Sequence, residues 1–406
     1  MLKTGYPHGQ TIVVLKPLSQ YDVLRVFCDD IAHGFEQLGC KAVVIDSARD
    51  DWGKQLFDGI NAGDIRFVFD FNGGASGIKH GEVALFDAAK TPFVSLFADS
   101  PLYHEDRLKA WIHHWLILFT NETAMATYRK GFSGRNHTLN GLAYLGGRRQ
   151  VTEPLKRLRD RKYGIAFMGS YYGKMAMVTQ IETDSGFMGG LLRDTLVEAL
   201  HDGTRTPLEV VASQLSRRGI DPEHMVPRGM FTVARYVEHK IRVYRRAKAI
   251  TAFKKLPVYL FGDESWKGLE GLGSNVQIMG TRPFSEAGEV FAETKIGLSM
   301  MPASSGGLHE RMLYGMHHGS VGLTDRLAHI PPEFKDNENV LFFDWNDLDH
   351  LEERVTDLLH NEDKLEEISE RGRALVQDRY SWKDTAKAVL AHAERHHYWL
   401  SMQARQ

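Results

Sequence analysis

Short apolar runs alternate with amphipathic stretches along most of this chain, and no other feature of the sequence constrains its fold more tightly. In the first third the stretch 21–38 has apolar residues at helical spacing, and Gly39 ends it. The runs are largely apolar rather than strictly alternating and contain several valines, which is typical of parallel strands covered on both faces; they are 12–15, 42–45, 65–71, 93–97 and 115–119. The pattern predicts a doubly wound α/β domain that ends near Gly147.

A second series of the same kind follows a charged stretch, 156–162, which we interpret as a linker between domains. Its predicted strands are 165–168, 258–261, 276–279, 296–300, 321–323 and 340–343, and its last helices are 348–359, 364–376 and 382–399. The region 174–255 is rich in helical pattern and shows no strand. We therefore expect an α/β protein with two Rossmann-like doubly wound domains facing a cleft, the second with a helix-rich insertion. The expected division is 1–155, 156–380 and a final helical segment, 381–406, that crosses back to the first domain.

Length and composition exclude several classes of protein. A chain of 406 residues is longer than one hydrophobic core normally serves, and a net charge of −2 argues against a nucleic-acid binder. The basic run 235–246, with Lys248, is interpreted as a solvated helix face. No apolar stretch approaches the ~20 residues of a membrane span, the start lacks a signal-peptide pattern, and two cysteines are too few for a disulfide framework. These features predict a cytoplasmic protein without an integral membrane segment.

Three turns at predicted strand ends are candidates for ligand binding, since ligands of parallel sheets bind beyond the carboxyl ends of the strands. They are 167–170, 279–283 and 301–316. In the third, a small-residue loop precedes a helix expected to open at Leu308, where free backbone N–H groups attract a diphosphate. Glu310 would lie in the first turn, where a carboxylate can accept ribose hydroxyls. The alternative is that Ser304 or Ser305 caps the helix and Glu310 completes a capping arrangement.

The segment 307–320, Gly-Leu-His-Glu-Arg-Met-Leu-Tyr-Gly-Met-His-His-Gly-Ser, resembles the donor-site helix of GT-B glycosyltransferases. The order of 280–284, 296–300 and Tyr-Ser-Trp at 380–382 is also similar to that family. The segments 98–101 and 167–170 resemble its spore-maturation CgeB-like branch. The resemblance covers most of 160–400 in order and only patches of 1–150.

This resemblance implies a nucleoside-diphosphate sugar as donor, with no cofactor. Glu310 would bind the ribose, and Arg282 would neutralise the phosphate as the leaving group departs. Gly169 and Ser170 would lie near the transferred sugar, and 278–280 near the base. The implied donor-binding set is Gly169, Ser170, Gly280, Arg282, Ser305, Gly306, Gly307, Leu308, His309 and Glu310, of which Gly306, Gly307 and Leu308 would offer backbone N–H groups. Retaining relatives often carry two glutamates eight positions apart, but here Pro302 stands eight before Glu310, so retention cannot be inferred.

The acceptor side is less well marked. Asp99 is the preferred catalytic base, because it follows a buried strand and Pro101 turns the chain directly afterwards; capping of the next helix is the alternative. His80 and His104 are other candidates, and the glycine-rich segment 72–77 is expected to border the acceptor or the sugar.

Metal signals are weak. Asp347 and Asp349 have the letters of a DxD motif but precede a helix, and His392 and His396 share a helix without a zinc-protease glutamate. We expect a metal-independent transferase with an unidentified acceptor and no nucleic-acid partner; the sequence does not determine the oligomeric state and is compatible with a homo-oligomer. Two alternatives remain at this point: a nucleotide-sugar 2-epimerase, and a non-catalytic sugar-nucleotide-binding protein in which 174–255 docks a partner.

Overall fold

The computed structural model of the 406-residue chain describes residues 9–132, 139–147, 154–173, 185–202, 204–222 and 227–403. It divides into two compact units. The first unit comprises Met1–Arg149 with Tyr380–Gln406, and the second unit comprises Gln150–Arg379.

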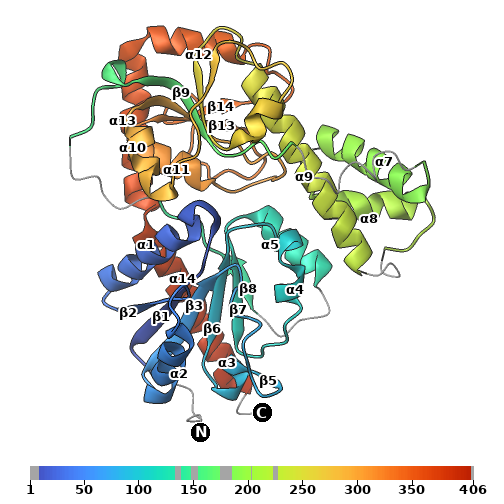
Figure 1. Ribbon diagram of the computed structural model, residues 1–406, viewed down its shortest axis with the longest axis vertical. Helices are drawn as coiled ribbons and strands as arrows, with labels where there is room; N and C mark the ends of the chain where they lie inside the picture. Colours follow the sequence, from blue (N-terminus) through green and yellow to red (C-terminus); the bar gives the residue numbers. More distant parts are fainter. Residues whose placement is uncertain are drawn as a thin grey trace. The chain divides into compact units, whose positions relative to one another are not determined.

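The first unit is built on a six-stranded parallel sheet of order β2-β1-β3-β6-β7-β8 (Figure 1). Its central strands are buried except at Arg66 of β3, which explains their largely apolar sequences. The strands are β1 (Thr11–Lys16), β2 (Lys41–Asp46), β3 (Ile65–Phe71), β6 (Phe93–Phe97), β7 (Trp115–Phe119) and β8 (Asn140–Leu142). A separate antiparallel pair consists of β4 (Lys79–His80) and β5 (Val83–Ala84).

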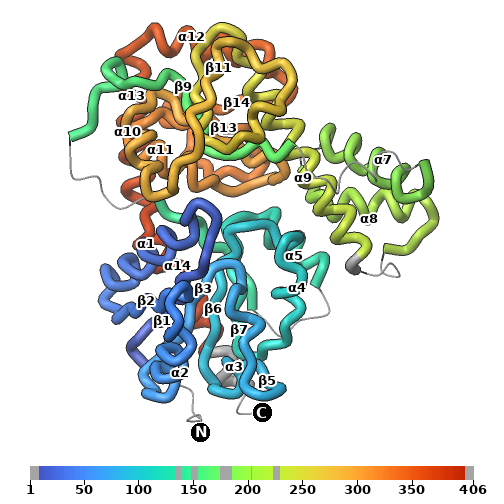
Figure 2. The backbone as a smooth tube through the Cα atoms, in the orientation of Figure 1, coloured from blue at the N-terminus to red at the C-terminus, as the bar shows by residue number. Residues whose placement is uncertain are grey.

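Helices cover this sheet, and the last of them comes from the far end of the chain. The helices of the first unit are α1 (Val23–Gln37), α2 (Trp52–Ala62), α3 (Leu85–Ala88), α4 (Glu105–Leu108), α5 (Glu122–Gly131) and α14 (Trp382–Gln403). Figure 2 shows α14, in red, running beside α1, in blue. The two backbones meet closely at Gly34, where a Cβ would lie 2.4 Å from the carbonyl oxygen of Trp382. The end of the chain thus completes the first unit.

The second unit holds another six-stranded parallel sheet, of order β11-β10-β9-β12-β13-β14. Its strands are β9 (Tyr163–Met168), β10 (Val258–Phe261), β11 (Val276–Ile278), β12 (Thr294–Leu298), β13 (Val321–Asp325) and β14 (Leu341–Phe343). The order reverses between β9 and β12. In doubly wound sheets, the connections that follow two such strands leave in opposite directions. The crevice between them, beyond the carboxyl ends of the strands, is where ligands bind.

The helices of the second unit fall into two groups. Around the sheet lie α10 (Ala287–Ala292), α11 (Glu310–His317), α12 (Leu351–His360) and α13 (Glu362–Arg379). Beside the sheet stand α7 (Phe187–His201), α8 (Pro207–Arg217) and α9 (Pro227–Thr251), which we call the arm (Figure 1). The carboxyl-terminal half of α9 enters the core of the second unit through Ala249 and Ile250.

The structure confirms the expected fold class of two doubly wound domains with a helix-rich insertion. The predicted strands and helices are present with ends shifted by a few residues, whereas β8 and the β4–β5 pair were not foreseen. The part 174–184 of the expected helical segment lies outside the described residues. The interpretation of 156–162 as a linker is wrong: Leu158 is buried, and Arg161 donates to the carbonyl oxygens of Phe291 and Thr294. The described residues of this stretch are therefore part of the second unit.

Candidate donor site

The first element of the candidate site is the turn that follows β9. Gly169 has φ +154°, a region in which only glycine is free of strain, and its N–H donates to the carbonyl of Phe261 at 2.9 Å. The Trp266 indole donates to the Gly169 carbonyl at 2.7 Å. A Cβ at Gly169 would lie 3.2 Å from the Phe167 ring and 3.5 Å from Nη2 of Arg311. Glycine at this position therefore lets the turn lie against an arginine.

The second element is the loop 301–309, which connects β12 with α11. Gly306 forms a parallel bridge with His329, and the N–H of Gly307 donates to the His329 carbonyl at 3.0 Å. The helix starts at Glu310, two residues later than expected. In this structure the Gly307 N–H is thus engaged within the protein, so a diphosphate would have to displace that bond to use it.

Arginine side chains occupy the space between these two elements. Arg246 of α9 is 4% exposed, donates to the Ser170 carbonyl, and lies over the rings of Phe167 and Tyr172, at 5.7 and 5.2 Å. Arg311, in the first turn of α11, lies over the same Phe167 ring, with its guanidinium 5.3 Å from the ring centroid. Two cations from distant parts of the sequence therefore share one aromatic ring at the carboxyl end of β9.

Positive charge in this cluster exceeds the negative charge that faces it. Burial, followed by the charges of Arg311 and Arg242, lowers the pKa of Arg246 well below its ordinary value. Arg242 pairs with Glu238 at 3.0 Å, but among the described residues the Nε of Arg246 is buried without a hydrogen-bond partner. A buried cation without a pair is costly. The cluster is consequently suited to bind an anion.

Glu310 is held beside this cluster by its neighbour His309. The Nδ1 of His309 lies 2.7 Å from Oε2 of Glu310, and the Nε2 lies 2.9 Å from Nη1 of Arg311. Although burial raises the pKa of the Glu310 carboxyl, the interaction with His309, followed by the charge of Arg311, lowers it to about 2. Glu310 is 20% exposed and ionised at neutral pH, so it can accept hydrogen bonds from a ligand.

The structure brings some of the predicted donor residues together and separates others. Gly169, Ser170, His309 and Glu310 meet through Arg246 and Arg311, and Ser305 to Leu308 form the adjoining loop. Gly280 and Arg282 instead follow β11, the edge strand of the sheet. Arg282 is exposed and donates to Glu286 at 3.2 Å. The role of Arg282 at a phosphate stays a prediction, and Arg246 and Arg311 are better placed for it.

Sequence reasoning missed Arg246 because it took the basic run 235–246 for a solvated face. That interpretation is wrong for Arg245 and Arg246, which are 7% and 4% exposed. The available signal was spacing: Arg246 lies four residues before the buried Ile250, and Arg245 lies four after the buried Ile241, so both fall on the apolar side of α9.

In the first unit, Asp99 lies at the carboxyl end of β6. Its Oδ2 accepts from Nδ2 of Asn72 at 2.8 Å, and Nε2 of His104 lies 3.7 Å away. Asn72 is buried with φ 58°, and its Oδ1 accepts from the backbone N–H groups of Ala98 and Asp99. The segments 72–77 and 98–104 thus form one edge. The Asp99 side chain is 63% exposed, so it is accessible; its role as a base stays a prediction.

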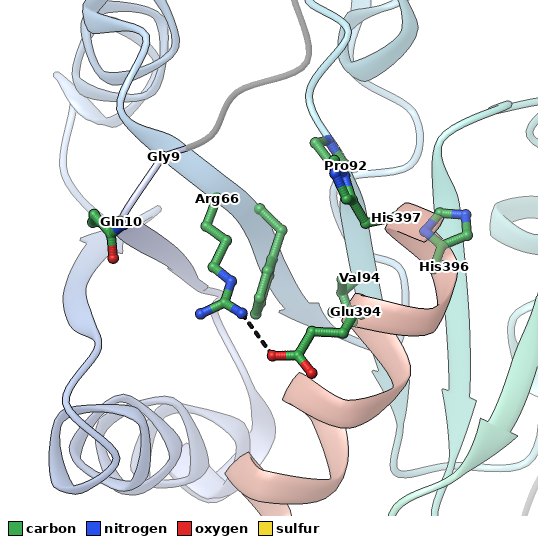
Figure 3. Close-up of a pocket in the computed structure, with 10 residues that line it drawn as sticks. Gly9, Gln10, Arg66, Pro92, Val94, Glu394, His396 and His397 are labelled. Atoms are coloured by element: carbon green, nitrogen blue, oxygen red, sulfur yellow. Dashed lines mark hydrogen bonds and ion pairs between the residues drawn. The ribbon is translucent and has the colours of Figure 1, made fainter. Parts of the chain in front are cut away.

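A cavity of about 560 Å³ lies at the opposite edge of the first sheet (Figure 3). It is lined at the amino ends of β1, β3 and β6 and by α14, and the ion pair of Arg66 and Glu394, at 2.9 Å, crosses its wall. Since Asp99 and Asn72 lie at the carboxyl ends of these strands, this cavity is not part of the site that they form.

The described residues contain no cluster of three or more His, Cys, Asp and Glu side chains arranged to hold a metal ion. Asp347 accepts a hydrogen bond from His350, and Nε2 of His392 lies 3.1 Å from the Leu142 carbonyl. No helix in the described part of the chain has the length and apolar character that a membrane span requires. Metal independence and a cytoplasmic location stay predictions.

Comparison with known proteins agrees with this architecture. Residues 242–391 match the family model described as glycosyl transferase-like. No curated protein matches the sequence significantly. Sucrose-phosphate synthase from Thermosynechococcus elongatus is similar in structure, with a TM-score of 0.54 and 10% identity over 98% of this chain and 100% of that one.

Two further solved structures show the same fold. An alpha-glucosyltransferase in complex with UDP and a 13-mer DNA containing an HMU base has a TM-score of 0.53 and 10% identity, covering 95% of this chain and 100% of that one. A glycosyltransferase from Rickettsia africae ESF-5 has a TM-score of 0.50 and 11% identity, covering 96% and 99%.

The two doubly wound parallel sheets and these structural matches define a GT-B fold. The matching segment includes Arg246, Glu310 and Arg311, and so contains most of the candidate site. Residues 242–391 are similar to the glycosyl transferase-like family, and the chain as a whole has the fold of these solved structures. The CgeB-like branch stays a prediction.

Proposed function

We propose that this protein transfers a sugar from a nucleoside-diphosphate sugar, held by the second unit, to an acceptor hydroxyl, without a metal ion. The observation that carries the proposal is the arginine cluster beside Glu310. Buried Arg246 and half-buried Arg311 supply positive charge at the switch point of the second sheet, and Glu310 supplies an ionised acceptor. A nucleoside diphosphate offers the complementary groups, namely an anionic diphosphate and a ribose with two hydroxyls.

In the proposed reaction the bond between the anomeric carbon and the diphosphate oxygen breaks, and its electron pair stays on the diphosphate. Arg246 and Arg311 stabilise that charge in a site shielded from water, where such contacts are strong. Glu310 holds the ribose. These three side chains come from two helices of one unit, so they are positioned before the donor arrives.

On the acceptor side, we propose that Asp99 takes the proton of the attacking hydroxyl if the reaction inverts the configuration. The hydrogen bond from Asn72 orients one carboxylate oxygen, and the exposure of Asp99 leaves room for an acceptor. The identities of the acceptor and of the transferred sugar are left open by this proposal.

The test is a binding screen of the full chain with UDP, GDP, dTDP, CMP and ADP by thermal shift and calorimetry. A ligand that binds only the folded state raises the melting temperature by an amount set by RT ln(1 + [L]/Kd). We expect one nucleotide to bind, and Arg246→Met and Glu310→Gln each to weaken it by about tenfold or more. Arg66→Met, which removes an arginine from the cavity of the first unit, should bind as the wild type does.

The outcomes separate the candidates. Absence of binding in well-folded wild-type protein would contradict the proposal, as would full binding in both variants. If Arg282→Ala loses nucleotide affinity and Arg246→Met keeps it, the phosphate binds at the turn after β11, as the sequence predicted. Once a nucleotide is known, its sugar derivatives test turnover: release of a free sugar-derived product that needs no acceptor would indicate a 2-epimerase, and binding without turnover a non-catalytic protein.

A further inference from the structure

Arg245, the neighbour of Arg246 on α9, contacts a different loop. Its Nη1 donates to the carbonyl oxygen of Pro302, and its Nη2 donates to that of Leu200 at 3.3 Å. Pro302 belongs to the loop 301–309, which ends at the candidate site, whereas Leu200 lies in the last turn of α7 in the arm. One buried guanidinium therefore links the arm with the loop that leads to Glu310.

Two residues of the second unit, Trp345 and Asp325, support the contact of Arg245 with this loop. The guanidinium lies over the ring of Trp345, at 5.2 Å, and the Trp345 indole donates to Oδ2 of Asp325 at 3.2 Å. Asp325, fully buried at the end of β13, accepts from the backbone N–H of Met301 at 3.0 Å with its other oxygen. The consecutive residues Met301 and Pro302 are thus held from two sides, one by the sheet and one by the arm.

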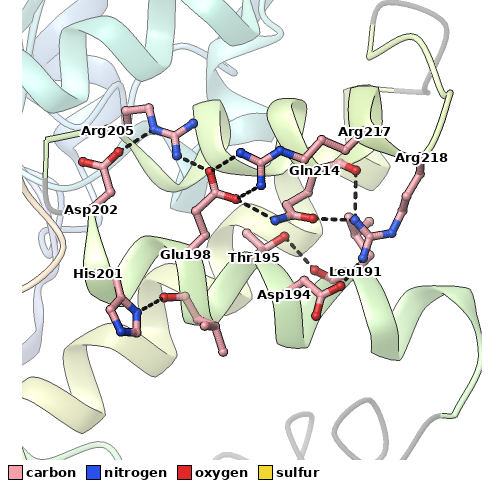
Figure 4. Close-up of polar contacts among 11 residues, drawn as sticks. Leu191, Asp194, Thr195, Glu198, His201, Asp202, Arg205, Gln214, Arg217 and Arg218 are labelled. Carbon is pink, nitrogen blue, oxygen red and sulfur yellow. Dashed lines mark hydrogen bonds and ion pairs between the residues drawn. The ribbon is translucent and has the colours of Figure 1, made fainter.

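Polar side chains around Glu198 join the helices of the arm to one another (Figure 4). Glu198, two residues earlier on α7, is 15% exposed and pairs with Arg205 and with Arg217, the latter at 2.8 Å. It also accepts from Nε2 of Gln214 at 2.6 Å, which fastens α7 to α8. Because Leu200 belongs to α7, a displacement of this helix would move the carbonyl that Arg245 binds.

We propose that Arg245 is a positioning residue that couples the arm to the loop 301–309, so that displacement of the arm changes the affinity for the nucleotide donor. The inference rests on the proposed function of the second unit. Arg245 acts through Pro302 and needs no contact with the donor. Its two carbonyl partners lie on elements more than a hundred residues apart in sequence, so the link is a property of the fold and not of either segment alone. Coupling of this kind between two sites is typically worth about 5- to 150-fold in affinity.

The experiment is a double-mutant cycle on nucleotide binding, with Arg245→Met, Glu198→Gln and the double variant, measured by calorimetry with UDP first and then the rest of the nucleotide panel. Met retains the packing against Trp345 but donates no hydrogen bond. We expect a Kd about tenfold higher for Arg245→Met and about threefold higher for Glu198→Gln. The double variant should bind no more weakly than Arg245→Met, because the arm then has no link to lose. Strictly additive effects, or wild-type affinity in Arg245→Met, would overturn the inference.

Controls separate positioning from folding. Lys248→Met changes an exposed cation of α9 and should leave binding unchanged. Arg245→Lys keeps the charge and one of the two bonds, and should recover part of the affinity. All variants are checked by circular dichroism and melting temperature without ligand. With a donor that is turned over, the KM for the donor should rise in Arg245→Met while kcat changes less than about twofold.

Hydrogen exchange without nucleotide provides a test that does not depend on donor binding. Backbone amides of 301–309 should exchange faster in Arg245→Met and in Glu198→Gln than in the wild type. In Lys248→Met their exchange rates should equal those of the wild type. If the wild type binds no nucleotide, the proposed function fails while this measurement still decides the coupling. If exchange in this loop is unchanged in both variants, the coupling fails whatever the binding result.

Discussion

His309 donates the proton of Nδ1 to Glu310 Oε2 across 2.7 Å, and this direction is fixed by a third residue. Arg311 can only donate, so its Nη1, 2.9 Å from Nε2 of His309, requires that nitrogen to be the acceptor. The proton of the neutral imidazole therefore lies on Nδ1. The backbone N–H of Arg311, 3.2 Å from the same Nδ1, would need the other tautomer, and the shorter contacts decide against it.

From this relationship we predict that His309→Leu lowers the affinity for the nucleotide that binds the wild type by about tenfold. The variant leaves the Glu310 carboxylate without its neutral hydrogen-bond donor in a largely buried place, which costs about 1–3 kcal/mol. Calorimetry at pH 7.5 measures the change, and His360→Leu on exposed α12 is the matched control. Equal affinity in His309→Leu and wild type would show that Glu310 is oriented without His309.

A second prediction concerns pH and the buried Asp70 at the end of β3. Burial raises its pKa from 3.8 to about 7, although the carboxylate accepts from the Ala75 N–H at 2.8 Å. The unfolded chain ionises first as the pH rises, so Asp70 lowers the free energy of unfolding progressively between about pH 4 and pH 7. Asp70→Asn removes this loss. The stability of the variant relative to wild type, measured by urea unfolding, should increase over that interval.

Asp46, on β2 of the same sheet, supplies a control of opposite sign. The hydrogen bond from Arg25, with Nη2 to Oδ2 at 2.6 Å, lowers the Asp46 pKa, so its contribution is present above pH 3.8 and is lost as the pH falls further. Asp46→Asn should cost about 1 kcal/mol at pH 7, and less as the pH falls below about 4. The same pH trend in both variants would mean that overall charge, and not the local environments, sets their stability.

The parts of this structure that were predictable from sequence are those in which local pattern and environment agree. The predicted strand 65–71 has the same bounds as β3, because a run of seven mainly apolar residues is typical of a strand covered on both faces in an α/β chain. The strand β8, Asn-Gly-Leu, has no apolar run and forms only because β7 offers a free edge. For Arg246, spacing along α9 indicates the buried side of the helix, but its partners, the Ser170 carbonyl and the rings of Phe167 and Tyr172, come from a distant segment and are known only from the fold.

Gly169 provides a prediction about the donor site that separates crowding from backbone strain. Gly169→Ala adds a Cβ at 3.2 Å from the Phe167 ring and 3.5 Å from Arg311, at a φ of +154°. We expect a loss of about 1–3 kcal/mol in stability and a several-fold loss in nucleotide affinity. Gly271→Ala, at φ +80° with no atom within 4 Å of the new Cβ, should lose stability only. Equal nucleotide affinity in Gly169→Ala and Gly271→Ala would show that the turn after β9 does not take part in nucleotide binding.

Gly34 tests whether the returning helix α14 stabilises the first unit. A Cβ at Gly34 would lie 2.4 Å from the Trp382 carbonyl oxygen and 3.2 Å from Cβ of Ala386, so Gly34→Ala must push α14 away from α1. Overpacking of this kind typically costs about 1–3 kcal/mol. Gly53→Ala in α2, where nothing lies within 4 Å, should instead stabilise by about 0.4–1 kcal/mol through the unfolded state. Denaturant unfolding measures the free energy of unfolding of both variants. A stabilised Gly34→Ala would mean that α1 and α14 can separate without lowering this free energy, so that packing of α14 against α1 does not stabilise the first unit.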